Sequence, residues 1–170
     1  MRSDVRQGPE IWLRGPVAVP EEPSPVPRGT ATARHFSWVG THGGSGTSTL
    51  SRVYGGHDCG HGWPGPADPP SVLLVGRTHA AGLAAVLRTL DLFRLGEAPR
   101  GLDLDAVVLV ADAPGRLPRP LAQHVKVIES VIDVYRVPWV PDWRLGDLTG
   151  RPPRETEALA RLTGAALDRR

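Results

Sequence analysis

The chain has 170 residues, of which 40% are hydrophobic and 22% charged, and this length accommodates one domain with a modest core. The 20 basic and 18 acidic side chains leave a net charge of only +2 and are mixed along the sequence, which argues against a nucleic-acid-binding protein. One cysteine excludes an intrachain disulfide and favours a cytoplasmic protein, and no apolar run approaches the roughly 20 residues of a transmembrane segment.

Proline is frequent in residues 1–33, where it lies among small and charged side chains. This composition predicts a disordered or polyproline II arm. The arm is either a plain linker or a ligand for a proline-recognising protein partner, because such segments lose little entropy on docking.

Residues 34–150 are predicted to form an α/β domain, because short apolar runs alternate with amphipathic segments. Strands are predicted at residues 35–40, 71–77, 105–112 and 134–137. Helices are predicted at residues 48–54 and 80–94, after Pro118 and Pro120, and at 154–168 within a C-terminal segment, 151–170. This order indicates a small parallel sheet flanked by helices.

A glycine-rich segment, Gly40 to Thr49, follows the first predicted strand and precedes the first predicted helix. This is the context of a phosphate-binding loop, in which backbone N–H groups at a helix N-terminus attract anions. The residues predicted to bind a phosphate are Gly43, Gly44, Ser45, Gly46, Thr47, Ser48 and Thr49. The alternative is a tight turn between a strand and a helix that binds no nucleotide.

The loop resembles the deviant Walker A motif of ParA/MinD-type ATPases, Lys-Gly-Gly-x-Gly-Lys-Ser/Thr-Thr, and the chain is also similar to actinobacterial proteins with a lysine-free loop. His42 stands in place of the signature lysine and Thr47 in place of the phosphate lysine. The resemblance implies a P-loop NTPase-like fold, ATP and Mg²⁺ as ligands, and a homodimer controlled by nucleotide. Loss of both lysines argues against efficient hydrolysis, because a cation on the developing phosphate charge supplies much of the catalysis.

Ser48 and Asp112 are the predicted Mg²⁺ ligands. Asp112 ends an apolar run and begins an Asp-x-Pro-Gly turn, which resembles a Walker B strand. By chain order, the same strand could instead be the later one that ends near the nucleotide base. Arg77 and Arg116 follow predicted strands and are candidates for the missing positive charge, or are solvated surface arginines.

Two further segments carry residue types that are common at binding sites. His57 to His61 contains four potential metal ligands, but no second Cys or His pair follows at zinc-finger spacing, so we interpret residues 55–70 as a flexible surface or lid loop. Trp139 and Trp143 lie in a loop that contains Pro138 and Pro141, in the position where the ParA/MinD-type family has a Pro-containing segment that lines the base pocket. They are predicted to contact adenine or a protein partner, or to cap a small core.

The sequence therefore predicts a degenerate ParA/MinD-like P-loop domain that binds nucleotide weakly or not at all and acts as an accessory or regulatory protein. The first alternative is an active Mg-ATPase in which an arginine replaces the lysine. The second is a protein-interaction module that works through the Pro-rich arm or through Trp139 and Trp143.

Overall fold

All five strands of the sheet run parallel, in the order β2-β1-β3-β4-β5. The structure is a computed structural model that describes residues 35–165. The predicted Pro-rich arm at 1–33 lies outside the described residues. The strands are β1 (Ser37–Gly40), β2 (His57–Asp58), β3 (Ser71–Arg77), β4 (Asp103–Val110) and β5 (Val134–Val137). The predicted α/β fold with a parallel sheet is confirmed.

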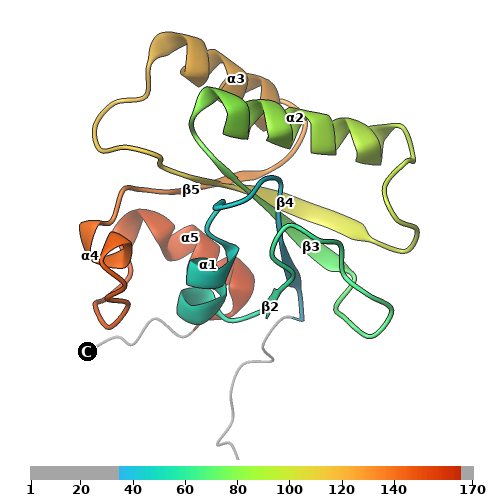
Figure 1. Cartoon of the computed structure of the whole chain (residues 1–170), viewed down its shortest axis with the longest axis horizontal. Helices are drawn as coiled ribbons and strands as arrows, with labels where there is room; N and C mark the ends of the chain where they lie inside the picture. Colours follow the sequence, from blue (N-terminus) through green and yellow to red (C-terminus); the bar gives the residue numbers. More distant parts are fainter. Residues whose placement is uncertain (1–34, 166–170) are drawn as a thin grey trace, which may run out of the picture. The chain divides into compact units, whose positions relative to one another are not determined.

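Helices cover both faces of this sheet, giving three layers (Figure 1). The helices are α1 (Thr47–Tyr54), α2 (Ala80–Arg94), α3 (Arg119–Glu129), α4 (Pro141–Arg144), the 3-10 helix η1 (Arg154–Thr156) and α5 (Glu157–Thr163). Side chains of α2 and α3 pack on one face, and those of α1, α4 and α5 pack on the other. This arrangement leaves the carboxyl ends of the strands free for loops that carry polar residues.

The core is divided in two by the alternation of side chains along the buried strands. In β3, Leu73 and Val75 face α1, whereas Val72 and Leu74 face α2. All four side chains are at most 2% exposed, so the apolar run of β3 does not alternate with polar residues. A continuous apolar run is typical of a parallel strand that is covered on both faces.

Several details of the prediction differ from the structure. The strand predicted at 35–40 begins two residues later, at Ser37. The insert at residues 55–70 contains β2, which is only two residues long and lies between glycines, so it has no periodic pattern. The strand predicted at 105–112 begins and ends two residues earlier, because its pairing with β3 starts at Asp103. The predicted helix 154–168 is divided into η1 and α5, and its last three residues lie outside the described part.

The C-terminal segment packs into the same core as the strands. Leu159 and Ala160 of α5 are at most 1% exposed and belong to the cluster on the α1 face of the sheet. The Tyr54 hydroxyl of α1 donates a hydrogen bond of 2.6 Å to the Thr156 hydroxyl. Among the described residues, no helix has the length and apolar character needed to cross a membrane.

Candidate functional site

The glycine-rich segment forms the turn from β1 into α1. Gly44 and Gly46 have φ values of 72° and 110°, in the left-handed region that residues with a Cβ rarely adopt. Gly46 is the residue before α1, and the first turn of α1 contains no acidic side chain. The N–H groups at this helix end therefore present positive partial charge without a compensating carboxylate within the turn.

Arg77, the last residue of β3, brings a positive charge to this turn. Its Nε donates a hydrogen bond of 2.9 Å to the carbonyl oxygen of Gly44, and its Nη1 donates one of 3.3 Å to the carbonyl oxygen of Ala111. A Cβ built at Gly46 would lie 3.7 Å from Nη2 of Arg77. Burial lowers the pKa of Arg77, but an arginine remains protonated in proteins. Of the two candidate arginines, Arg77 is the one at the loop.

His42, which is predicted to stand in place of a signature lysine, is hydrogen-bonded within its own domain. Its Nε2 accepts a hydrogen bond of 3.0 Å from the backbone N–H of Arg77, and its Nδ1 lies 2.9 Å from the carbonyl oxygen of Gly43. Because Nε2 is an acceptor, the proton of the ring lies on Nδ1, which donates to Gly43. The ring also lies 5.2 Å from that of His79, between centroids. His42 thus connects the loop to β3 instead of extending away from the domain.

Ser48 has a carboxylate partner that the sequence did not predict. Its hydroxyl donates a hydrogen bond of 2.6 Å to Oδ2 of Asp58, and Oδ1 of Asp58 accepts one of 2.9 Å from the N–H of Gly60. Burial raises the pKa of Asp58, but these hydrogen bonds and one from Thr47 outweigh it, so the pKa lies below its usual value. An ionised Asp58 next to the Ser48 hydroxyl offers two oxygen ligands of the kind that Mg²⁺ prefers.

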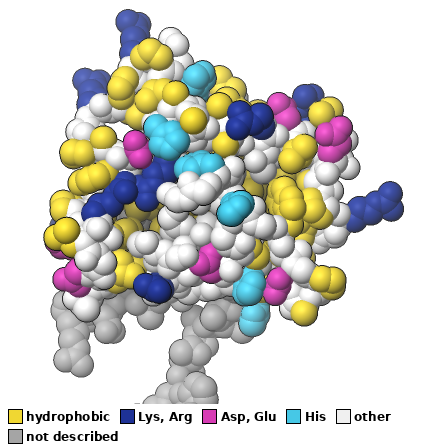
Figure 2. All heavy atoms as spheres, in the orientation of Figure 1, with side chains coloured by type: hydrophobic (Ala, Val, Ile, Leu, Met, Phe, Trp, Pro, Cys, Tyr) yellow, Lys and Arg dark blue, Asp and Glu magenta, His cyan; other side chains and the backbone are white. Residues whose placement is uncertain are grey.

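The loop lines an open cavity of about 380 Å³. The cavity is lined by residues 42–49 together with Gly60, His61 and Arg77. Figure 2 shows histidine side chains across the middle of this face of the molecule, with basic side chains (Lys or Arg) beside some of them. A concave surface with backbone N–H groups, an arginine and hydroxyl groups can accept an anion.

Asp112 and Arg116 line a different cavity. This second cavity has a volume of about 530 Å³, lies at the end of β4, and shares no lining residue with the loop cavity. The backbone N–H of Asp112 donates a hydrogen bond of 3.1 Å to the Thr78 hydroxyl. The structure thus groups Asp112 with Arg116, and it places Asp58 beside Ser48. The Mg²⁺ role of Asp112 stays a prediction.

The two tryptophans after β5 are in contact with the protein itself. Trp143 packs against the core on the α1 face, with its ring centroid 6.5 Å from that of Tyr54. The guanidinium of Arg144 lies 4.3 Å above the ring of Trp139. A space of about 40 Å³ remains between this segment and the loop, and it shares Gly46, Thr49 and Arg77 with the loop cavity. Such a volume holds about one water molecule.

Fold and site together define an α/β protein with a fully parallel sheet and a glycine-rich turn between its first strand and first helix. Residues 35–162 match a family of unknown function, DUF6668, and the chain belongs to this family. Neither the curated proteins nor the solved structures contain a match to the chain.

Proposed function

We propose that this chain is a degenerate ParA/MinD-like P-loop domain. Its loop binds the phosphate groups of a ligand with Arg77 in place of the missing lysine. In this proposal the domain binds complete nucleotides weakly and acts as an accessory or regulatory protein, not as an efficient ATPase. The observation that carries the proposal is the 2.9 Å hydrogen bond from Arg77 Nε to Gly44, which holds a guanidinium at the phosphate-binding turn.

Phosphate binding is supported by the donors that converge on the loop cavity. Arg77 uses one N–H on Gly44 and one on Ala111, and an arginine has five. The remaining N–H groups are on the two terminal nitrogens, and Nη2 lies against Gly46 at the start of α1. A phosphate in the cavity would accept charge-assisted hydrogen bonds from this guanidinium and from the helix N-terminus.

Weak binding of complete nucleotides is supported by the segment after β5. In the ParA/MinD-type family a Pro-containing segment in this position lines the base pocket. Here Pro138 of this segment lines both the cavity of about 530 Å³ and the space of about 40 Å³ next to the loop, and Trp143 and Arg144 form part of the lining of the smaller space. A purine is far larger than the 40 Å³ space, so Trp143 or Arg144 must move before a base can lie next to the loop in that space. The free energy needed for this movement lowers the affinity for nucleotide relative to that for a free phosphate compound.

Slow hydrolysis is supported by the partners of the two residues that replace the lysines. His42 uses both ring nitrogens within the domain, and Thr47 is 5% exposed and hydrogen-bonded to Asp58. Neither side chain supplies a cation to the transferred phosphoryl group. Mg²⁺ would be held by Ser48 and Asp58, where it would neutralise phosphate charge. Arg77 is then the one arginine or lysine among the described residues that line this loop cavity.

Calorimetric titration with pyrophosphate and with ATP, each with Mg²⁺, tests the proposal. We expect pyrophosphate to bind at one site, ATP to gain no affinity from its adenosine, and Thr47→Lys to increase the affinity for both. Gly46→Val is expected to abolish binding, because a side chain at φ 110° changes the turn. Circular dichroism controls for the fold of each variant.

Two results would contradict the proposal. Undetectable binding of pyrophosphate at millimolar concentration would exclude a phosphate site in this loop. An ATP turnover of about 1–100 s⁻¹, as in efficient phosphotransfer enzymes, would instead support the active ATPase with Arg77 as its cation.

A further inference from the structure

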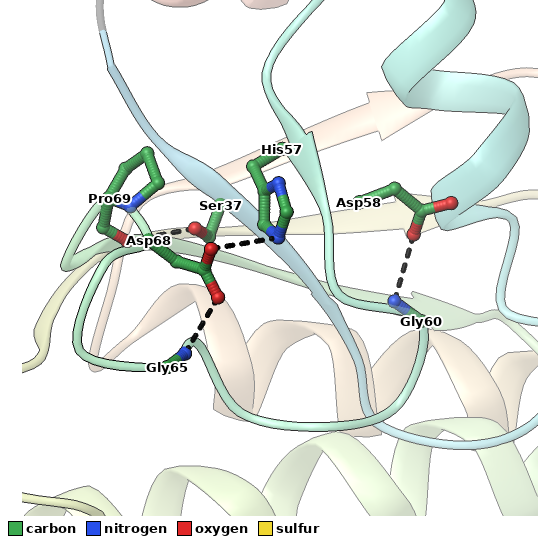
Figure 3. A network of polar contacts seen from close by, with 7 residues as sticks. All are labelled: Ser37, His57, Asp58, Gly60, Gly65, Asp68 and Pro69. Atoms are coloured by element: carbon green, nitrogen blue, oxygen red, sulfur yellow. Dashed lines mark hydrogen bonds and ion pairs between the residues drawn. The ribbon is translucent and has the colours of Figure 1, made fainter.

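The insert between α1 and β3 presents its polar side chains on two opposite faces. The backbone N–H groups of His57 and Cys59 donate to the carbonyl oxygens of Phe36 and Trp38, at 2.9 and 3.0 Å, so these residues extend the sheet beside β1. Side chains alternate along a strand, and Asp58 accordingly points toward α1, away from His57 (Figure 3). His57 and Cys59 therefore share the face opposite the Ser48 site.

Asp68 reaches the same face from the other end of the insert. The backbone N–H of Asp68 donates to the carbonyl oxygen of Gly65 at 3.0 Å, and the N–H of Gly65 donates to Oδ2 of Asp68 at 2.7 Å. This turn leaves Oδ1 of Asp68 directed at His57, with a separation of 3.3 Å from Nε2 (Figure 3). Three potential ligands thus converge from residues that are up to eleven positions apart.

We propose that His57, Cys59 and Asp68 form a binding site for a divalent transition metal ion of the zinc type. One ligand atom from each residue lies within 4.8 Å of the other two. Two ligands at about 2.0–2.1 Å from a tetrahedral zinc ion are separated by about 3.3–3.4 Å. The distance of 3.3 Å between Nε2 of His57 and Oδ1 of Asp68 fits this geometry without rearrangement.

The ligand types select the metal. An imidazole nitrogen, a thiolate sulfur and one carboxylate oxygen suit Zn²⁺ and related ions, whereas Mg²⁺ and Ca²⁺ take oxygen ligands almost alone. Three protein ligands leave a fourth tetrahedral position for water or an exogenous ligand. His57 and Asp68 side chains are 45% and 31% exposed, so an ion can reach the site from solvent.

Neighbouring groups hold the insert that carries the three ligands. Ser37, which is fully buried, donates a hydrogen bond of 2.8 Å to the carbonyl oxygen of Pro69, next to Asp68. Trp63, in the middle of the insert, packs edge-on against Phe93 of α2 with centroids 5.6 Å apart. Outer partners of this kind orient the ligands of metal sites. The insert is therefore held at both ends and in its middle.

Titration of the chelator-treated full chain with Co²⁺ tests the site on the wild-type protein. We expect one Co²⁺ per chain, with the intense near-ultraviolet absorption of a thiolate-to-cobalt charge transfer and the visible bands of a tetrahedral ion. Added Zn²⁺ is expected to displace the cobalt. Absence of the thiolate absorption at a tenfold excess of Co²⁺ would overturn the proposal without reference to any variant.

Variants assign the ligands. Cys59→Ser is expected to abolish the thiolate absorption. His57→Gln and Asp68→Asn are each expected to lower the affinity for Zn²⁺ by more than the roughly 10–100-fold that loss of an outer partner costs. His61→Gln is the matched control, because His61 lies in the same insert but lines the loop cavity. A loss for His61→Gln as large as that for His57→Gln would overturn the assignment.

Discussion

Replacing Arg77 with methionine is expected to weaken the binding of pyrophosphate about 10- to 150-fold. The side chain keeps its apolar stem but loses the guanidinium that donates to Gly44 and lies against Gly46. A hydrogen bond to a charged group contributes about 1.5–3 kcal/mol, and each 1.4 kcal/mol changes a dissociation constant about tenfold. Isothermal titration calorimetry at fixed ionic strength measures this difference directly.

Two further variants test whether the loss of pyrophosphate affinity comes from the guanidinium at the loop. Arg77→Lys keeps the charge but loses the forked donors, so its affinity is expected to fall between those of the wild type and Arg77→Met. Arg116→Met removes an arginine from the other cavity and should leave the affinity unchanged. An unchanged affinity for Arg77→Met, or an equal loss for Arg116→Met, would refute the reasoning.

Two other predictions concern the fold that positions the loop, and chemical denaturation measures both. Gly82→Ala is expected to lower the free energy of unfolding by about 1–3 kcal/mol, because the added Cβ would lie 2.3 Å from the carbonyl oxygen of Arg77. Gly43→Ala is the control: its Cβ would meet no atom within 4 Å, so the free energy of unfolding should change by less than about 0.5 kcal/mol. Leu159→Ala is expected to cost about 2–5 kcal/mol, because the side chain is 1% exposed in the core; a cost below about 1 kcal/mol would mean that α5 is not part of the cooperative unit.

The parallel sheet could be predicted from the sequence because its central strands are long apolar runs. Val72 to Val75 and Val107 to Val110 are buried on both faces of the sheet. Apolar runs of this kind, each followed by an amphipathic segment, are typical of a parallel sheet covered by helices. β2 could not be predicted in the same way. Its position is set by hydrogen bonds from the N–H groups of His57 and Cys59 to Phe36 and Trp38, which are distant in sequence and leave no local pattern.

The candidate site was predictable in its backbone and less so in its side chains. The glycine spacing was sufficient to place the turn between β1 and α1, because positive φ values require glycine there. The partner of Ser48 depends on which strand lies next to β1. The sequence pointed to Asp112 after a long apolar run, whereas the structure places Asp58 beside Ser48 from a strand of two residues. Asp68 was missed because a turn, not a motif, directs it at His57.

The brevity of β2 also limits the free edge that the sheet of residues 35–165 presents to another strand. A sheet edge with unpaired N–H and C=O groups invites a further strand from another molecule. β2 offers only two residues, and the carbonyl of Gly60 in the insert accepts from the N–H of Gly40 beyond them, at 2.6 Å. At the opposite edge, β5 has four residues and is followed by Pro138, which has no N–H. Among residues 35–165, the sheet therefore offers a further strand only two residues at one edge and four at the other.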